Sequence, residues 1–376
     1  MATSANKKFR VLIVDDSAFM RKVLETIINA DDQLQVVGQA KDGRECVALA
    51  ESLKPDVITM DINMPHVDGL QATAQIMTTN PRPIVVVSSE SRDGAASTLK
   101  ALELGAIEFV AKPSSGIDLD MQNVKEELLR KVRMAAKVRV VRIASRLAST
   151  VQGTKDGVAP AAPPKAAPRA QQPPPIDQRF PIVVLGASTG GPATVMRLAP
   201  GFTRDFPAAV FLVQHMPASF TTQYAAQLAE FTSIRVKEAE PNEPVQPGTL
   251  FICPGAQHLR ITPTGRIQLD ATSGRINGYL PCIDVTMETA AAYAGAMTIG
   301  VVLTGMGNDG AAGAKAIQSA GGLVIAQDEA TAVIFGMPAE AIKAANVEHV
   351  LALDDIYAAI EKRVISICKA TPVGVK

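Results

Sequence analysis

This 376-residue sequence contains no tryptophan, and cysteine, histidine and tyrosine each occur only four times. The cysteines form no pair at metal-binding or redox spacing, which indicates reduced, packed thiols rather than disulfides: Cys46, Cys253, Cys282 and Cys368. No apolar run approaches the roughly 18 residues that a membrane-spanning helix needs, and the N-terminal segment has no signal-peptide core. We therefore expect a cytoplasmic protein without membrane insertion.

An excess of charge of either sign is also missing, because 37 basic residues balance 37 acidic ones. Such a chain has no overall field to attract nucleic acid or an acidic membrane. The C-terminal half has neither a helix-turn-helix pattern nor a basic stripe, which argues against a DNA-binding regulator and predicts no nucleic-acid partner. Hydrophobic residues make up 47 % and charged residues 20 % of a chain long enough for two globular domains.

Two regions of alternating strands and helices flank a segment of different composition. Residues 151–181 are rich in proline, alanine and glutamine and poor in large apolar side chains, so they cannot bury enough surface to offset the entropy of ordering. This composition indicates a semi-extended linker. We predict a first domain over residues 8–125, a helix extension and linker over 126–180, and a second domain over 181–368.

The first region contains five short β-branched runs separated by helical patterns, which predicts a doubly wound parallel sheet of the α/β class. A helical pattern continues from Leu119 to Leu147, with many basic residues in Lys131–Arg146. We interpret these basic residues as a solvated helix side, and a partner-binding face is the alternative. The five expected strands are Phe9–Val14, Gln35–Gln39, Val57–Met60, Ile84–Ser88 and Ile107–Val110.

The strand–helix alternation resumes after the linker and predicts a second doubly wound domain, a Rossmann-like three-layer α/β fold. Between about Arg235 and Asp270 the pattern changes to short strands broken by proline and glycine. We expect antiparallel β-hairpins there, inserted into the α/β domain. The main strands are expected at Ile182–Leu185, Ala208–Gln214, Thr298–Leu303 and Leu323–Ala326.

Polar side chains gather at the carboxyl ends of the first region's predicted strands. Asp15, Asp16 and Asp61 follow the first and third strands, while Ser88 and Lys112 mark the ends of the fourth and fifth. These ends meet at one sheet edge, where three carboxylates would repel one another unless a cation such as Mg²⁺ neutralised them. A hydroxyl and a lysine suit a phosphoryl group. A helix N-cap would explain the aspartate pair alone, and a turn would explain the lysine alone. Five polar residues at the ends of these strands together indicate a phosphorylation site.

These residues lie in the motifs VLIVDDSAFMR, DVITMDINMPHVDG, VVVSSE and GAIEFVAKP, which resemble the receiver domain of two-component response regulators. The resemblance covers about residues 8–125 and implies a flavodoxin-like fold with a sensor histidine kinase as phosphodonor. It implies that Asp61 is the phosphoacceptor. It implies a Mg²⁺ site made by Asp61, Asp16 and the carbonyl of Asn63, with Asp15 acting through water. By the same resemblance, the switch hydroxyl is Ser88, the switch aromatic is Phe109 and the pocket lysine is Lys112.

A glycine-rich strand-to-helix turn carries Ser188 at the start of the second domain. Such a turn places backbone N–H groups and a helix N-terminus near the hydroxyl, where they would stabilise an oxyanion. A nucleophilic serine also needs a positioned base. His215 ends the next strand and reaches the same sheet edge, so we prefer it to His258, which remains the alternative base or a substrate-cleft residue. The other two histidines are assigned to the receiver and to the surface: His66 and His349.

The segment VVLTGMGNDG ends another apolar strand in a glycine-rich loop and supplies the acidic candidate Asp309. Serine, histidine and aspartate at three strand ends form the geometry of a catalytic triad. An N-cap of the next helix is the alternative role for Asp309. The order Ser, His, Asp argues against the α/β-hydrolases. The lack of a charged residue at the end of the following strand argues against a dinucleotide-binding reductase.

The blocks LGASTGGP, VQHMP, FICPG, LTGMGNDGA and FGMPAEAI resemble the protein-glutamate methylesterases of bacterial chemotaxis, over about residues 180–368. By that resemblance Ser188 is the nucleophile, His215 the base and Asp309 the residue that orients the base. Two residues flank the oxyanion site: Thr189 and Met306.

The implied function is a phosphorylation-regulated serine esterase that hydrolyses glutamate γ-methyl esters on chemoreceptors and also deamidates receptor glutamines. The esterase domain needs no cofactor for this reaction, and the unphosphorylated receiver is expected to cover the esterase cleft. The rival hypothesis is a non-catalytic regulator that only binds receptors or an adaptor. The three triad residues argue against it, because a binding module has no need of them together.

Overall fold

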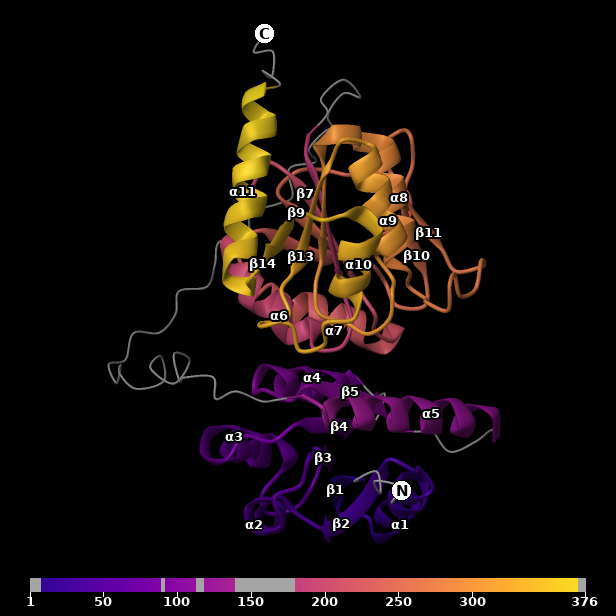
Figure 1. Cartoon of the computed structure of the whole chain (residues 1–376), viewed down its shortest axis with the longest axis vertical. Helices are drawn as coiled ribbons and strands as arrows, with labels where there is room; N and C mark the ends of the chain where they lie inside the picture. Colours follow the sequence, from indigo (N-terminus) through magenta and orange to yellow (C-terminus); the bar gives the residue numbers. More distant parts are fainter. Residues whose placement is uncertain (1–7, 89–91, 113–117, 139–179, 371–376) are drawn as a thin grey trace, which may run out of the picture.

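The computed structural model describes residues 8–88, 92–112, 118–138 and 180–370. Two parallel β-sheets, each covered by helices, lie in two domains that contact each other (Figure 1). The predicted α/β class is therefore confirmed. The predicted linker falls outside the described residues except for Phe180 and Pro181, as does the basic segment beyond residue 138.

The first sheet has the order β2-β1-β3-β4-β5 with all strands parallel, which is the flavodoxin-like order. Each strand agrees with its predicted run to within one residue: β1 Phe9–Val14, β2 Leu34–Ala40, β3 Val57–Met60, β4 Ile84–Ser88 and β5 Glu108–Ala111. The helices between and after them are α1 Ala18–Asn29, α2 Gly43–Leu53, α3 Gly69–Thr79, α4 Arg92–Glu103 and α5 Asp118–Ala135.

Alternate side chains of these strands enter cores on opposite faces of the sheet, since successive residues of a strand point to opposite sides. Val11 and Ile13 join the core formed with α1 and α5, where Leu128 and Val132 of α5 are buried. The other face is covered by α2, α3 and α4, and Leu12 of β1 is buried there. The α5 helix thus packs on the receiver sheet and ends at Ala135, and the part of the predicted helical pattern beyond residue 138 lies outside the described residues.

The second sheet contains seven parallel strands in the order β14-β13-β12-β6-β7-β9-β8. Its strands are β6 Ile182–Ala187, β7 Ala209–Gln214, β8 Arg235–Glu238, β9 Thr249–Ile252, β12 Thr298–Val302, β13 Leu323–Gln327 and β14 His349–Leu351. The helices are α6 Gly191–Leu198, α7 Ala218–Leu228, α8 Ile283–Ala294, α9 Ala311–Ser319, α10 Met337–Ala345 and α11 Leu353–Ala370, with short 3-10 turns at Ala199–Gly201 and Gly295–Met297.

Three layers result, as in Rossmann-like folds. Val183 and Leu185 of β6 face the core formed with α6, α7 and α11, whereas Ile182 and Val184 face the core formed with α8, α9 and α10. Strands buried on both faces explain why their sequences are continuously apolar rather than alternating.

The prediction of inserted hairpins is correct in part. β10 (His258–Ile261) and β11 (Ile267–Asp270) form an antiparallel hairpin outside the main sheet. The preceding strands β8 and β9 do not form a hairpin, because both run parallel to β7 and extend the main sheet. Both strands have only four residues, and the proline and glycine residues that separate them gave the segment the appearance of hairpins. The short edge strand β14, with the exposed His349, was also not predicted.

The two domains meet where α4 of the receiver packs against α6 and α7 (Figure 1). The aromatic rings of Phe109 and Phe220 contact each other at this junction, with centroids 4.4 Å apart. Both side chains are almost fully buried, at 3 % and 0 % exposure. The apolar core therefore runs without a break from the receiver sheet into the second domain.

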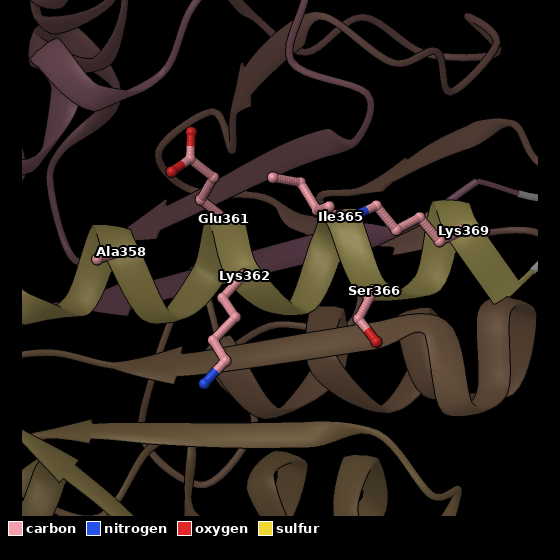
Figure 2. Close-up of a pocket in the computed structure, with 6 residues that line it drawn as sticks. All are labelled: Ala358, Glu361, Lys362, Ile365, Ser366 and Lys369. Atoms are coloured by element: carbon pink, nitrogen blue, oxygen red, sulfur yellow. The ribbon is translucent and has the colours of Figure 1, made fainter.

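The outer side of α11 lies far from this junction and carries a shallow groove of about 480 Å³ (Figure 2). It is lined by Ala358, Glu361, Lys362, Ile365, Ser366 and Lys369. Among the described residues, no helix combines the length and apolar character required to cross a membrane.

Candidate active site and phosphorylation pocket

The predicted acidic pocket of the receiver is present at the carboxyl ends of β1 and β3. Carboxylate oxygens of Asp15, Asp16 and Asp61 lie within 4.8 Å of one another. Asp15 and Asp61 are buried, at 0 % and 5 % exposure, while Asp16 is exposed. The N-cap of α1 is Ser17, whose hydroxyl accepts from the Met20 N–H. The carboxylates are therefore not needed as that helix's cap.

Lys112, at the end of β5, reaches into this pocket and contacts two carboxylates. Its Nζ lies 2.8 Å from Asp15 Oδ2 and 2.9 Å from Asp61 Oδ2. Burial raises the pKa of Asp61, and the charge of Asp15 adds to that effect, even though Lys112 opposes it. Burial would lower the pKa of Lys112, but its hydrogen bonds with Asp15 and Asp61 outweigh burial and raise it. The pocket holds more negative than positive charge.

The predicted switch residues lie between this pocket and the second domain. The Ser88 hydroxyl, at the end of β4, donates to the carbonyl of Gly94, 3.3 Å away, in α4. Phe109 of β5 is held by Lys131 of α5, whose Nζ donates to its carbonyl at 2.6 Å and lies 4.9 Å from its ring centroid. Asn63 is exposed in the loop after β3, two residues beyond Asp61.

Ser188 and His215 follow neighbouring parallel strands, β6 and β7, whose last residues, Ala187 and Gln214, are paired in register. The next residue along each strand is the predicted nucleophile or base, so both reach the same edge of the sheet. The His215 N–H donates to the carbonyl of Ala187 at 3.1 Å. The Gln214 amide donates to the carbonyls of Ser188, at 2.9 Å, and His215, at 3.2 Å. This buried side chain ties the two loops together.

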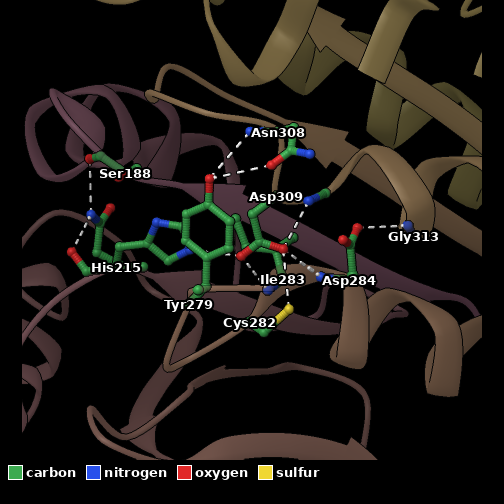
Figure 3. A network of polar contacts seen from close by, with 12 residues as sticks. Ser188, His215, Tyr279, Cys282, Ile283, Asp284, Asn308, Asp309 and Gly313 are labelled. Atoms are coloured by element: carbon green, nitrogen blue, oxygen red, sulfur yellow. Dashed lines mark hydrogen bonds and ion pairs between the residues drawn. The ribbon is translucent and has the colours of Figure 1, made fainter. Parts of the chain in front are cut away.

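His215 forms a short hydrogen bond with Asp309, from Nε2 to Oδ2 at 2.7 Å (Figure 3). His215 is partly exposed and Asp309 is fully buried, with side-chain exposures of 16 % and 0 %. The structure thus brings together the predicted serine turn, imidazole and carboxylate from three separate strand ends. Their catalytic roles remain predictions.

Asp309 is held by the start of α8. Its oxygens accept backbone N–H bonds from Ile283 at 2.8 Å and from Asp284 at 3.0 Å, and a weaker contact from the thiol of Cys282 at 3.3 Å. The Gly310 N–H donates to it as well. Burial would raise the pKa of Asp309, but the hydrogen bond and charge of His215 and these N–H groups outweigh burial and lower it.

The alternative role that we considered for Asp309 was the N-cap of the next helix, α9. That alternative is wrong, because the helix whose first turn Asp309 contacts is α8. The N-cap of α9 is Gly310, and the carboxylate that accepts from the first turn of that helix is Asp284, from the Gly313 N–H at 2.7 Å. Asp309 instead accepts from the first turn of α8, which is distant in sequence. Its carboxylate therefore serves the α8 N-terminus and His215 at once.

His258 is not available as the alternative base. It is fully buried at the start of β10. Its Nε2 lies 2.7 Å from the carbonyl of Gly274, and its Nδ1 accepts from the N–H of Cys282 at 3.2 Å. Both ring nitrogens are thus hydrogen-bonded to the backbone, so this side chain has a structural role: it connects Gly274 to Cys282.

The two flanking residues lie close to the serine turn. Thr189 is buried, and its carbonyl accepts from the Thr304 hydroxyl at 2.9 Å. Met306 is 40 % exposed in the loop after β12, and its Sδ lies 3.6 Å from Nη1 of Arg130 on α5 of the receiver. A receiver side chain therefore reaches the loop that borders the predicted oxyanion site.

Sequence reasoning missed two neighbours of the site, Gln214 and Tyr279. The Tyr279 ring stacks on the imidazole of His215, with centroids 4.9 Å apart and planes inclined by 16° (Figure 3). The Asn277-Gly278 pair before it is a strong turn signal, but no local pattern reveals which distant ring the turn approaches.

Comparisons with known proteins agree with this layout. Residues 11–122 match the family model of the response regulator receiver domain, and residues 183–360 match that of the CheB methylesterase. A protein-glutamate methylesterase/protein-glutamine glutaminase of Pyrococcus horikoshii is 41 % identical over 95 % of this chain and 94 % of that protein. A protein of Nitratidesulfovibrio vulgaris with the same name and the number 2 is 44 % identical over 93 % and 98 %.

Among solved structures, the CheB methylesterase catalytic domain of Thermotoga maritima is similar, with 39 % identity and a TM-score of 0.46, covering 49 % of this chain and 98 % of that one. The fold, the site and the two family models define a response-regulator receiver joined to an esterase domain. On the strength of relatives that match nearly its whole length, the chain belongs to the protein-glutamate methylesterase/protein-glutamine glutaminase family.

Proposed function

We propose that this protein is a phosphorylation-regulated serine esterase that hydrolyses glutamate γ-methyl esters on chemoreceptors and deamidates receptor glutamines in the cytoplasm. The observation that carries the proposal is the His215–Asp309 hydrogen bond of 2.7 Å beside the Ser188 turn. The names of the relatives indicate the substrate, because they couple a glutamate methylesterase with a glutamine glutaminase.

In the proposed reaction the Ser188 hydroxyl attacks the ester carbonyl carbon while His215 accepts its proton. Since Nε2 of His215 bonds to Asp309, Nδ1 is the ring nitrogen left to accept that proton. Collapse of the tetrahedral intermediate breaks the bond to the methoxy group, which leaves as methanol with the proton from His215. Water activated by His215 then hydrolyses the acyl-enzyme to glutamate and regenerates Ser188. An amide substrate would release ammonia instead.

Asp309 supports the proton transfer by charge and by orientation. Its lowered pKa keeps it ionised at neutral pH, and an ionised partner stabilises the imidazolium that forms. We assign the developing oxyanion to backbone N–H groups near Thr189 and Met306. The start of α6 adds its positive dipole end, and Gly190 (φ 74°) turns the chain into that helix.

The receiver is proposed to be phosphorylated on Asp61 by a sensor histidine kinase. The site fits a divalent cation, because three carboxylates lie within 4.8 Å and their negative charge exceeds that of Lys112. Mg²⁺ would be held by Asp16, Asp61 and the Asn63 carbonyl, with Asp15 through water. When bound, it would neutralise the acidic cluster and the charge of the incoming phosphoryl group. Ser88 and Lys112 would then contact the phosphoryl oxygens.

Contacts between the domains support control of the esterase by the receiver. Phe109 is packed on Phe220 of α7, and Arg130 contacts Met306 beside the esterase site. In the unphosphorylated state these contacts would restrict access to Ser188. A phosphoryl group on Asp61 would pull on Ser88 and Phe109 and favour an open arrangement. Deleting residues 1–180 should therefore raise activity above that of the unphosphorylated whole protein.

Methanol release from a methylated receptor preparation, measured with and without a small-molecule phosphodonor and Mg²⁺, tests the proposal. Release that depends on Ser188 and rises with the phosphodonor is expected. A chain that binds receptor but releases no methanol in either condition would instead support the non-catalytic regulator. A deletion variant no more active than the unphosphorylated chain would rule out simple occlusion.

A further inference from the structure

The loop between β11 and α8, residues 271–282, forms a small hairpin with a defined tip. Ile276 and Tyr279 exchange two backbone hydrogen bonds, of 3.0 and 2.9 Å. The residues between them, Asn277 and Gly278, have φ values of 53° and 89°. Positive φ at both central positions is the requirement of a type I′ turn, which Asn-Gly meets with little strain. Tyr279 therefore leaves the tip in a fixed direction.

Both ends of this hairpin are anchored independently of Tyr279. The Asp270 carboxylate accepts from the N–H groups of Thr272 and Ser273, at 2.9 and 3.1 Å. Buried His258 bridges the carbonyl of Gly274 and the N–H of Cys282. These contacts fix the hairpin without Tyr279. The hairpin therefore positions the tyrosine, and the tyrosine is not needed to position the hairpin.

Tyr279 contacts two parts of the esterase site at once. Its ring lies on the imidazole of His215 at 4.9 Å. Its hydroxyl accepts from the Asn308 N–H at 3.3 Å and donates to the Asn308 Oδ1 at 3.4 Å, which ties it to the loop that follows β12 (Figure 3). Gly307 in that loop has a φ of 93°, and a Cβ there would lie 2.0 Å from the Tyr279 oxygen.

We propose that Tyr279 is a positioning residue of the esterase. Its ring holds the His215 imidazole in the plane in which Nε2 bonds to Asp309, which leaves Nδ1 to accept the proton of Ser188. Its hydroxyl fixes the loop 306–308, which carries Met306 and the proposed oxyanion donor. This inference rests on the proposed esterase function and adds to it a residue outside the triad.

The ring and the hydroxyl of Tyr279 make separate contributions, which substitutions can remove one at a time. Tyr279→Phe keeps the stacked ring and loses the hydroxyl contacts with Asn308. Tyr279→Leu loses both. Tyr357→Phe is the matched control, because its hydroxyl also makes a side-chain hydrogen bond, to Glu361, but lies on α11.

The test uses the full-length protein with a phosphodonor and methylated receptor. It also measures the rate at which a fluorophosphonate probe labels Ser188, which reports nucleophile activation without receptor binding. Tyr279→Phe should lower kcat about threefold to tenfold, because it loses the two long hydrogen bonds of the hydroxyl with Asn308. Tyr279→Leu should lower it on the order of 100-fold, with KM within twofold of the parent value. Labelling should slow in parallel, and Tyr357→Phe should match the parent protein.

Three results would overturn the inference. The first is a kcat of Tyr279→Leu within twofold of the parent. The second is a loss that falls entirely on KM with unchanged labelling, since Tyr279 would then contact receptor rather than position His215. The third is equal loss in Tyr279→Phe and Tyr279→Leu with a matching fall in melting temperature. Labelling that persists in Ser188→Ala would instead contradict the proposed function itself.

Discussion

Asp61 and Asp309 occupy comparable places, each buried near the carboxyl edge of a parallel sheet, but their environments are electrostatically opposite. Burial and the neighbouring Asp15 raise the pKa of Asp61 in spite of Lys112. Burial acts on Asp309 in the same direction, but His215 and backbone N–H groups overcome it and lower its pKa. The three carboxylates of the receiver pocket face one lysine, whereas the Asp309 carboxylate is stabilised by His215 and by backbone N–H groups.

This difference fits the two chemical tasks. A carboxylate that has to accept a phosphoryl group benefits from a pocket that is completed only when a cation and the phosphoryl group arrive. A carboxylate that has to orient an imidazole in every catalytic cycle must be ionised and fixed beforehand.

Ser188→Ala should lower esterase activity on the order of 10⁶-fold, because the remaining groups cannot form the acyl-enzyme. The partly exposed hydroxyl at this turn contributes little to packing, so the melting temperature should stay close to that of the parent protein. Methanol release and thermal denaturation measure the two properties. Residual activity above a small fraction of the parent would show that another group is the nucleophile.

Asp309→Asn should lower kcat on the order of 10⁴-fold, by analogy with other triads in which the amide favours the wrong histidine tautomer. It should also lower the melting temperature, because its NH₂ group would face N–H donors of Ile283 or Asp284. Asp354→Asn is a matched control, since this carboxylate is 80 % exposed on α11. Unchanged kcat in Asp309→Asn would remove Asp309 from the triad.

Asp61→Asn should abolish the rise in esterase activity that a phosphodonor and Mg²⁺ produce, because the amide cannot accept the phosphoryl group. Incorporation of labelled phosphate, measured beside methanol release, tests both the site and its effect. Asp32→Asn, an exposed position of the same domain, should keep the full response. If Asp61→Asn still incorporates phosphate and responds, the phosphoacceptor lies elsewhere.

Asp284→Asn should stabilise the protein at high pH. Burial raises the pKa of Asp284 from 3.8 to about 6, assisted by the charge of Asp309. Between these values the folded state keeps a proton that the unfolded state has lost, so this group's contribution to stability is lost as pH rises through 6. The amide avoids that cost and can still accept from the Gly313 N–H.

The expected gain for Asp284→Asn is about 1–3 kcal/mol at pH 8 and close to zero at pH 4. Melting temperatures across this range measure it. Glu288→Gln is the control, because that exposed carboxyl lies on the same helix. A gain of equal size at both pH values would mean that the amide improves packing rather than relieving a buried charge.

Much of the fold could be predicted because buried parallel strands have continuous apolar sequences. Their ends also identify the positions of Asp61, Lys112, Ser188 and His215, since strand order brings those ends to a common edge. The strands β8 and β9 were misjudged because short apolar runs separated by proline and glycine have the same local pattern in a parallel sheet as in a hairpin. Local pattern does not specify the partner strand.

The remaining parts of the site depend on contacts between segments that are distant in sequence. Asp309 bonds to N–H groups at the start of α8, and Tyr279 reaches His215 from a separate hairpin. The Asn277-Gly278 turn sets the backbone direction at Tyr279, but the residues around it do not specify which distant ring the tyrosine meets. Similarly, the contact between Phe109 and Phe220 depends on how the two domains dock, and the sequence pattern of either domain alone does not specify the docking.

The unbroken apolar core across the Phe109–Phe220 junction limits how freely evolution could exchange the two halves of this protein. A receiver taken from a relative would bring its own α4 surface, while α6 and α7 would keep the complementary shape of their original partner. Such a chimera could preserve every phosphorylation and triad residue and still lose the link between them. Receiver and esterase are therefore expected to have been inherited as a matched pair, with α4 and α7 changing together.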